Sequence, residues 1–139
     1  MSWHILDTDT LTLYQSGHLV VVQRVSQCRP DDLALTIISV EEELTGWYTK
    51  LRRAKKKEHL ARAYQRLTDA VRFFSRLNIL SFTEPAIERY EALRTAHRQI
   101  GKNDLRIAAI TLEHSGTVVT RNVRDFRQVP GLLVEDWSL

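Results

Sequence analysis

The chain alternates between short apolar runs and longer stretches in which apolar residues recur every three or four positions. The short runs predict buried strands; they lie at residues 3–6, 33–38, 79–80 and 117–120, and residues 132–134 allow a fifth strand at the sheet edge. Helical spacing is found in residues 40–51, 60–77, 84–100 and 104–115. This alternation predicts one α/β domain over residues 1–139 with a mostly parallel sheet of four or five strands.

Two places along the chain need a choice of local structure. The β-branched run at residues 19–22 is typical of a strand, but the apolar positions after it also fit a helix that ends near Cys28, and we favour the helix. Ser39 follows the second apolar run and Glu42 comes three residues later. This spacing predicts a capping box at the start of the next helix.

Carboxylates stand where the apolar runs stop. Asp7 follows the first run, Glu42 follows the second, and Asp125 follows the fourth. Asp104 opens the apolar helical stretch that precedes the fourth run. The carboxyl ends of parallel strands meet at one edge of a sheet, so we expect these acids to approach one another. A cluster of like charges implies a bound cation or raised pKa values.

A hard divalent cation such as Mg²⁺ suits this set of oxygen donors. Mg²⁺ is usually held by one or two carboxylates together with waters and substrate phosphates. Asp7 and Asp104 are the predicted ligands, and Glu42 and Asp125 are additional or water-mediated ligands. A single acid at a helix start is more often a cap than a ligand, so the prediction depends on the whole set.

Composition narrows the classes of protein and the expected location. The 139 residues carry a formal net charge of +3, which is weak evidence for a nucleic-acid partner. Cys28 is the only cysteine, which excludes an intrachain disulfide and a cysteine-based zinc site. We find no charged leader with an apolar core and no run of membrane-spanning length, so the expected location is the cytoplasm, with no membrane partner.

Four segments in order form a more specific pattern, at residues 6–11, 38–47, 103–109 and 119–137. The first reads Leu-Asp-Thr-Asp-Thr-Leu, and the third reads Asn-Asp-Leu-Arg-Ile-Ala-Ala. The second contains three consecutive glutamates, of which Glu42 lies four residues before Gly46. Together these segments span nearly the whole chain. They resemble PIN-domain ribonucleases, and more closely the VapC-type toxins of type II toxin–antitoxin pairs.

The resemblance implies a fold, an activity and partners. The fold is a PIN-like α/β/α sandwich on a parallel sheet. The activity is Mg²⁺- or Mn²⁺-dependent endonucleolytic cleavage of RNA, with metal ligands at Asp7 and Asp104 and a further functional acid at Glu42. The substrate is transfer, ribosomal or messenger RNA. The implied partners are a small VapB-type antitoxin that covers the site and a second copy of the chain in a homodimer.

The closing segment departs from the family pattern. Asn122 stands where many relatives have Asp, and Asp125 either replaces that acid or caps the turn. Thr120, at the strand end, is a candidate for orienting a carboxylate or a water. Arg121 and Arg124 lie beside the expected site and are candidates for contact with RNA phosphates.

Other functions compete with ribonuclease activity. Residues 7–10 also fit the start of a haloacid-dehalogenase-type phosphatase, with Asp7 as nucleophile and Asp9 as acid/base, but no Gly-Asp-x-x-x-Asp follows Asp104. A phospho-receiver domain would need Lys where Arg121 stands. A PIN-like module that binds RNA or a partner without cutting is a further alternative.

The two middle helices carry their own candidate surfaces. Residues 52–57 hold five positive charges, which would contact RNA phosphates or form a solvated helix face. An exposed apolar stripe on these helices would suit dimerisation or antitoxin docking.

Overall fold

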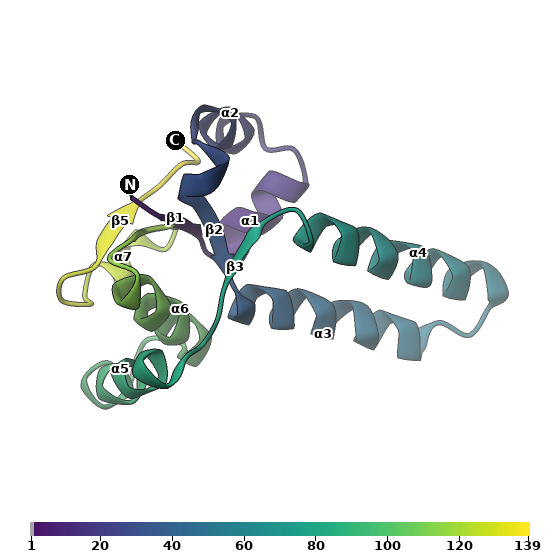
Figure 1. Ribbon diagram of the computed structural model, residues 1–139. Coiled ribbons are helices and arrows are strands. Elements are labelled where there is room, and N and C mark those ends of the chain that lie inside the picture. The colour runs from purple at the N-terminus through teal and green to yellow at the C-terminus, as the bar shows by residue number, and fades with distance from the viewer. Residues whose placement is uncertain (1) are drawn as a thin grey trace.

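The computed structural model describes residues 2–139, and a five-stranded parallel sheet forms its centre (Figure 1). The strand order is β3-β2-β1-β4-β5. The strands are β1 (His4–Leu6), β2 (Leu33–Thr36), β3 (Asn78–Leu80), β4 (Thr117–Val119) and β5 (Leu133–Glu135). The helices are α1 (Thr8–Gln15), α2 (Leu19–Gln27), α3 (Ile37–Arg53), α4 (Lys57–Phe74), α5 (Glu84–Ala96), α6 (Lys102–Glu113) and α7 (Val123–Phe126), with a 3₁₀ turn at Pro30–Asp32.

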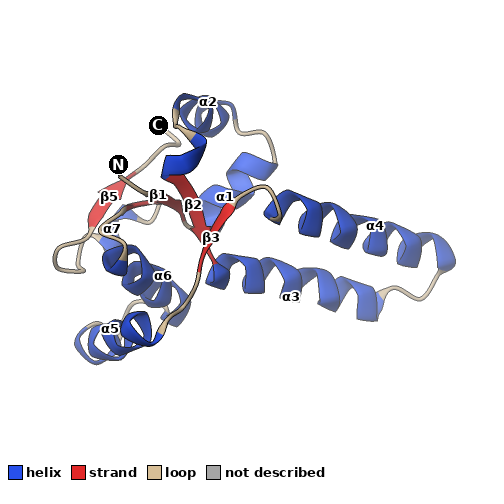
Figure 2. Ribbon diagram, in the orientation of Figure 1, coloured by secondary structure: helices blue, strands red, loops and turns tan. Residues whose placement is uncertain are grey.

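Helices cover both faces of the sheet (Figure 2). Val118 of β4 packs with α5, α6 and α7 on one face, where Ile107 and Ile110 of α6 are fully buried. Val119, the next residue, packs with α2 on the other face, next to the cluster that joins α1, α3 and α4. Successive strand residues point to opposite faces, so each short strand contributes to both cores. The predicted α/β/α sandwich with a parallel sheet is confirmed.

Two features of the fold matter for the candidate site: the carboxyl ends of the central strands, and the hairpin formed by α3 and α4. β1 lies at the centre between β2 and β4, in parallel register with both. The Asp7 backbone N–H donates to the Val119 carbonyl at 3.0 Å, which ties the carboxyl ends of β1 and β4 together. α3 and α4 run antiparallel and extend beyond the sheet as a long hairpin (Figure 1). No helix within residues 2–139 has the length and apolarity needed to cross a bilayer.

The predicted start of α3 was wrong. The apolar run at 33–38 contains the strand only to Thr36, and the following two isoleucines form the first turn of the helix. Thr36 is the N-cap, and its hydroxyl accepts from the Ser39 N–H at 3.4 Å. Ser39 is fully buried inside the helix, so it forms no capping box with Glu42. An apolar run cannot by itself separate a buried strand from the buried first turn of a helix.

The other helix boundaries differ less from those predicted from the sequence. Residues 19–27 are helical, as favoured. The helix predicted to reach residue 100 ends at Ala96, because His97 leaves the helical conformation and a turn then buries Ile100 in the core. The sequence did not predict α7, a four-residue helix that contains Asp125.

Candidate active site

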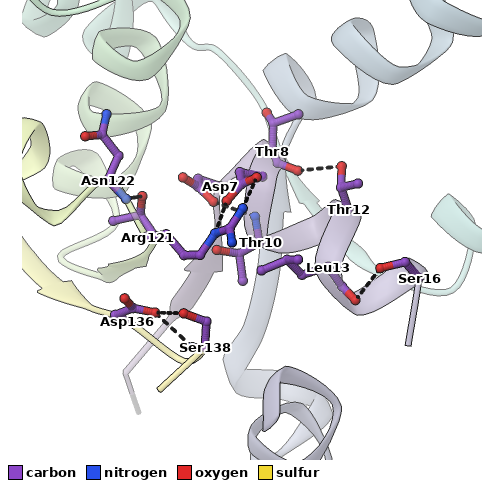
Figure 3. Close-up of polar contacts among 12 residues, drawn as sticks. Asp7, Thr8, Thr10, Thr12, Leu13, Ser16, Arg121, Asn122, Asp136 and Ser138 are labelled. Carbon is purple, nitrogen blue, oxygen red and sulfur yellow. Dashed lines mark hydrogen bonds and ion pairs between the residues drawn. The ribbon is translucent and has the colours of Figure 1, made fainter. Parts of the chain in front are cut away.

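Asp7 is the centre of the site and is almost completely buried, with 3% of its surface exposed. It follows β1 and is the N-cap of α1, where its Oδ1 accepts from the Thr10 N–H at 2.8 Å. A helix N-terminus carries partial positive charge, which favours a carboxylate there. The strand places Asp7 at the carboxyl edge of the sheet, and the cap fixes its orientation (Figure 3).

Glu42 is held in place by the residue that follows Asp7. The Thr8 hydroxyl donates to Glu42 Oε1 at 2.7 Å and lies 2.8 Å from the Ser39 hydroxyl. The carboxylate on α3 is thus connected to the first turn of α1. Of its acidic neighbours, Glu41 is exposed, and Glu43 accepts from the Gln15 amide at 3.0 Å.

Asp104 lies in the first turn of α6. The Asn122 side-chain amide donates to Asp104 Oδ2 at 3.4 Å and to Asp125 Oδ2 at 3.0 Å. Asn122 is itself fixed by its backbone N–H, which donates to the Thr120 hydroxyl at 2.9 Å. The amide thus separates two carboxylates that would otherwise repel each other directly.

Arg121 closes the rim of the site through an ion pair with Asp9. Its Nε donates to Asp9 Oδ2 at 2.7 Å and its Nη2 to Asp9 Oδ1 at 3.0 Å. Such a two-point pair fixes the plane of the guanidinium group. Both side chains are half exposed, so the pair contributes little to stability. Arg124 is exposed on α7 and does not line the cleft described next.

These side chains surround one open cleft at the carboxyl edge of β1. Its lining includes three of the four predicted acids, together with Asn122 and the Arg121–Asp9 pair; the acids are Asp7, Glu42 and Asp104. Asp125 lies outside the lining and touches the site through Asn122. The structure therefore brings together side chains from the segments after β1, β2 and β4 and from the start of α6.

Asp7 and Asp104 are costly to ionise in this cleft. Burial raises the pKa of Asp7, and hydrogen bonds from Thr120 and Thr10 offset only part of that effect. Burial, followed by the negative charge of Asp7, raises the pKa of Asp104, although the hydrogen bond from Asn122 opposes this. Positive charge placed between Asp7 and Asp104 would reverse both effects.

The donor set is compatible with a hard divalent cation. Within residues 2–139, no group of three or more His, Cys, Asp or Glu side chains is placed so that all of them could hold one metal ion. The cleft instead offers carboxylate oxygens from Asp7, Asp104 and Glu42. One or two such carboxylates, completed by waters and substrate phosphates, are the usual protein share of a Mg²⁺ site.

Two functional contacts were missed in the sequence. Ser39, which supports Glu42 together with Thr8, was interpreted only as a helix cap. The Asp9–Arg121 pair joins residues 112 positions apart. The position of Thr8, next to a predicted ligand in the first turn of a helix, was the one available signal, because neither its rotamer nor its partner can be read from spacing.

Comparison with known proteins identifies chains with a similar sequence and fold. The family model described as "PIN domain" matches residues 7–132. Ribonuclease VapC1 of Haemophilus influenzae (strain R2866) is 29% identical over 141 residues, which cover 97% of this chain and 98% of that protein. Ribonuclease VapC2 of Rickettsia felis is 39% identical over 70 residues, which cover 48% of this chain and 52% of that protein.

Solved structures give the same result for the fold. The VapBC2 complex of Rickettsia felis, bound to a DNA fragment from its promoter, contains a chain with a TM-score of 0.72 and 27% identity, covering 96% of this chain and 98% of that one. The structure of VapBC-1 from nontypeable Haemophilus influenzae gives a TM-score of 0.71 and 27% identity, with 98% of both chains covered.

Proposed function

This chain belongs to the PIN-domain family, and on that basis we propose that it is an endoribonuclease of the VapC type, the toxin of a toxin–antitoxin pair, that depends on Mg²⁺ or Mn²⁺. The resemblance to PIN domains and VapC ribonucleases found in the sequence is confirmed. Hydrolysis of RNA is supported by the ribonuclease relatives that match along the full chain. The metal dependence is the further step of the proposal.

One observation supports the metal dependence most strongly. Three acids from separate elements, Asp7, Glu42 and Asp104, line the same cleft, and two of them have raised pKa values. When ionised, these carboxylates repel one another and a polyanion such as RNA. A cation bound between them would neutralise the acids and let RNA approach.

Each side chain then has a stated role. Asp7 and Asp104 would hold the cation, and Glu42, fixed by Thr8, would complete the site or orient the attacking water. When bound, a divalent cation supplies positive charge that acidifies water and stabilises the charge that builds up on a phosphodiester. Asn122 keeps Asp104 and Asp125 apart and so preserves the position of Asp104.

The geometry disfavours the phosphatase alternative. That mechanism needs Asp9 free to exchange protons with a substrate next to Asp7. Both oxygens of Asp9 accept hydrogen bonds from the Arg121 guanidinium, so neither oxygen faces a substrate freely. A nucleophile at Asp7 would therefore lack its acid/base partner.

The test is cleavage of total RNA by the purified protein with Mg²⁺ or Mn²⁺, with chelator, and with Asp104→Asn. We expect cleavage only with the metal, and a loss of at least about 100-fold in Asp104→Asn, since a cation site contributes several kcal/mol to the transition state. Asp31→Asn, an exposed acid in the 3₁₀ turn before β2, is the matched control and should cleave normally. Equal activity of wild type and Asp104→Asn would refute the site. An inactive but RNA-binding wild type would favour the non-catalytic module.

The proposed partner is a small antitoxin protein encoded next to this chain. Two of the solved relatives, each 27% identical to this chain, are structures of VapBC2 and VapBC-1. We expect that expression of this chain alone arrests growth and that co-expression of the adjacent small protein restores it. Growth arrest that persists in Asp104→Asn would show that toxicity does not depend on RNA cleavage.

A further inference from the structure

Positive charge is concentrated in one part of the chain. Residues 50–66, at the far half of the α3–α4 hairpin, contain eight of the 20 Lys and Arg residues and one of the 17 Asp and Glu residues. This stretch therefore carries a formal charge of +7, and the remainder of the chain, with 12 basic and 16 acidic residues, carries −4. A modest overall charge of +3 conceals two regions of opposite sign.

These cations lack ion-pair partners among residues 2–139. All eight basic side chains of residues 50–66 are exposed. Across the described part of the chain, none of them forms an ion pair with a carboxylate; the ion pairs found there involve Arg24, Arg89 and Arg121. Like charges so close together repel one another, and a polyanion bound to the hairpin would relieve that repulsion.

Half of these cations line a groove between the two helices, which we call the basic groove. Lys50 and Arg53 come from α3, and Arg62 and Arg66 come from α4. The other lining residues include His59 and Trp47, and no acid is among them. The Lys50 ammonium lies 4.4 Å from the centre of the Trp47 ring. Positive charge alongside an aromatic face is the usual arrangement for holding single-stranded nucleic acid.

The basic groove is continuous with the candidate active site. A larger cavity lies between them; it shares Lys50 and Arg66 with the groove, and Thr8 and Glu42 with the acid cleft. Glu43 and Asp69 also face this middle cavity, but each accepts a hydrogen bond from a neighbouring glutamine. From Glu42 to Arg53 the helix rises ~16 Å, a distance that a strand of a few nucleotides can cover.

We propose that the basic groove is an RNA-binding exosite, which holds the phosphodiester backbone of a single-stranded segment next to the segment that is cut. This inference rests on the proposed ribonuclease function for the identity of the polyanion. The groove supplies affinity where the acid cleft cannot, because the carboxylates of the cleft repel RNA until a cation is present. Three of its four cations are arginines, whose planar groups match phosphate oxygens in pairs.

An acidic protein segment is the competing occupant, and the lining argues against it. Protein docking grooves depend on aromatic or aliphatic anchors in fully desolvated pockets. Here the apolar lining consists of Trp47, Ala54 and Ala63, and the charged side chains are exposed. RNA also has to reach the acid cleft, and the groove opens toward that cleft.

The test compares two variants with equal loss of charge. In the groove variant, Arg53, Arg62 and Arg66 are changed to Gln; in the control variant, Arg94, Arg98 and Lys102, which are exposed around a separate cavity near α5, are changed to Gln. Binding of a fluorescent single-stranded RNA of ~20 nucleotides is measured with chelator present, over a range of salt concentrations. Each lost phosphate contact lowers the salt slope by about 0.7.

The groove variant should lose about 2 from the slope and bind at least about tenfold more weakly at 0.1 M salt, while the control variant keeps the wild-type slope. A variant with Lys at the three groove positions should retain most of the slope, and circular dichroism should show all variants folded. Equal losses in both Gln variants would mean that only net charge matters, and no loss in the groove variant would overturn the proposal. So would unchanged RNA binding with weakened binding of the adjacent small protein, because the groove would then be a protein-docking surface.

The RNA-binding test of the basic groove is independent of the test of RNA cleavage. Binding with chelator does not require activity, so a wild type that binds RNA through the groove but never cuts would refute the proposed function and leave the exosite intact. Among active proteins, the groove variant should raise KM for a long RNA and leave kcat unchanged, because the groove does not contact the reacting phosphate.

Discussion

Asp7 caps helix α1 and is a proposed ligand of the cation, and two substitutions separate these two roles. Asp7→Asn keeps an oxygen that can accept from the Thr10 N–H, whereas Asp7→Ala loses this cap. Loss of an N-cap costs about 1 kcal/mol. For a domain of this size we expect Asp7→Ala to melt ~3–4 °C below Asp7→Asn. Both variants lack the carboxylate, so both should lose at least about 100-fold in RNA cleavage.

The pH dependence of stability tests the burial of this carboxylate. Burial raises the folded-state pKa of Asp7 above its ordinary value of 3.8, so the fold binds a proton here more tightly than the unfolded chain does. The stabilisation from this group is therefore complete below pH 3.8, and it is lost as the pH rises through the raised pKa. In the presence of chelator, Asp7→Asn should be more stable than wild type at pH 7, and this difference should shrink as the pH falls toward 4.

Urea denaturation at several pH values, followed by circular dichroism, gives the free energies of unfolding. The cleavage assay on the same preparations gives the activities. A result in which Asp7→Asn is as unstable as Asp7→Ala would refute the cap and burial argument. Wild-type cleavage by Asp7→Asn would refute its role as a ligand, whatever its stability.

Two further predictions concern the hydrogen bonds around the acids. Thr8→Val removes the donor to Glu42 without changing the side-chain shape, and should lower kcat about tenfold, as loss of an orienting partner typically does, while Thr8→Ser keeps the activity. Asn122→Asp replaces the amide between Asp104 and Asp125 by a third carboxylate, and should lower the free energy of unfolding by about 1–2 kcal/mol at low salt, with recovery when Mg²⁺ is added. Normal kcat in Thr8→Val would show that Glu42 needs no support from Thr8, and unchanged urea denaturation of Asn122→Asp would contradict the close approach of these acids.

Much of the architecture could be predicted from residue types and their order. Short runs of consecutive apolar residues predict strands that are buried on both faces of a sheet. The amphipathic stretches between them predict crossover helices, so a parallel sheet follows. Asp7 and Asp104 could be predicted as members of one acid cluster, because each adjoins an apolar element that must lie in the core. The resemblance of four segments to PIN domains could also be seen in the sequence, because each segment consists of residues that are close together along the chain.

The tertiary structure decided which distant residues meet. Residues 33–38 are apolar except for Thr36, and only packing showed that the strand stops at Thr36 and that Ser39 faces Thr8. The Asp9–Arg121 pair was out of reach of the sequence, because the approach of residues 112 positions apart depends on the placement of β4 next to β1.

The α3–α4 hairpin with its basic groove shows the same division between what the sequence determines and what the tertiary structure determines. The charge run at residues 52–57 is plain in the sequence, where it fits a solvated helix face as well as an RNA contact. Antiparallel packing of α4 on α3 brings Arg62 and Arg66 opposite Lys50 and Arg53, and it joins their groove to the acid cleft. The sequence alone determined the amount of charge and the helices that carry it. The direction in which each helix turns its charges depends on which of its faces is buried, and only the tertiary structure decides that.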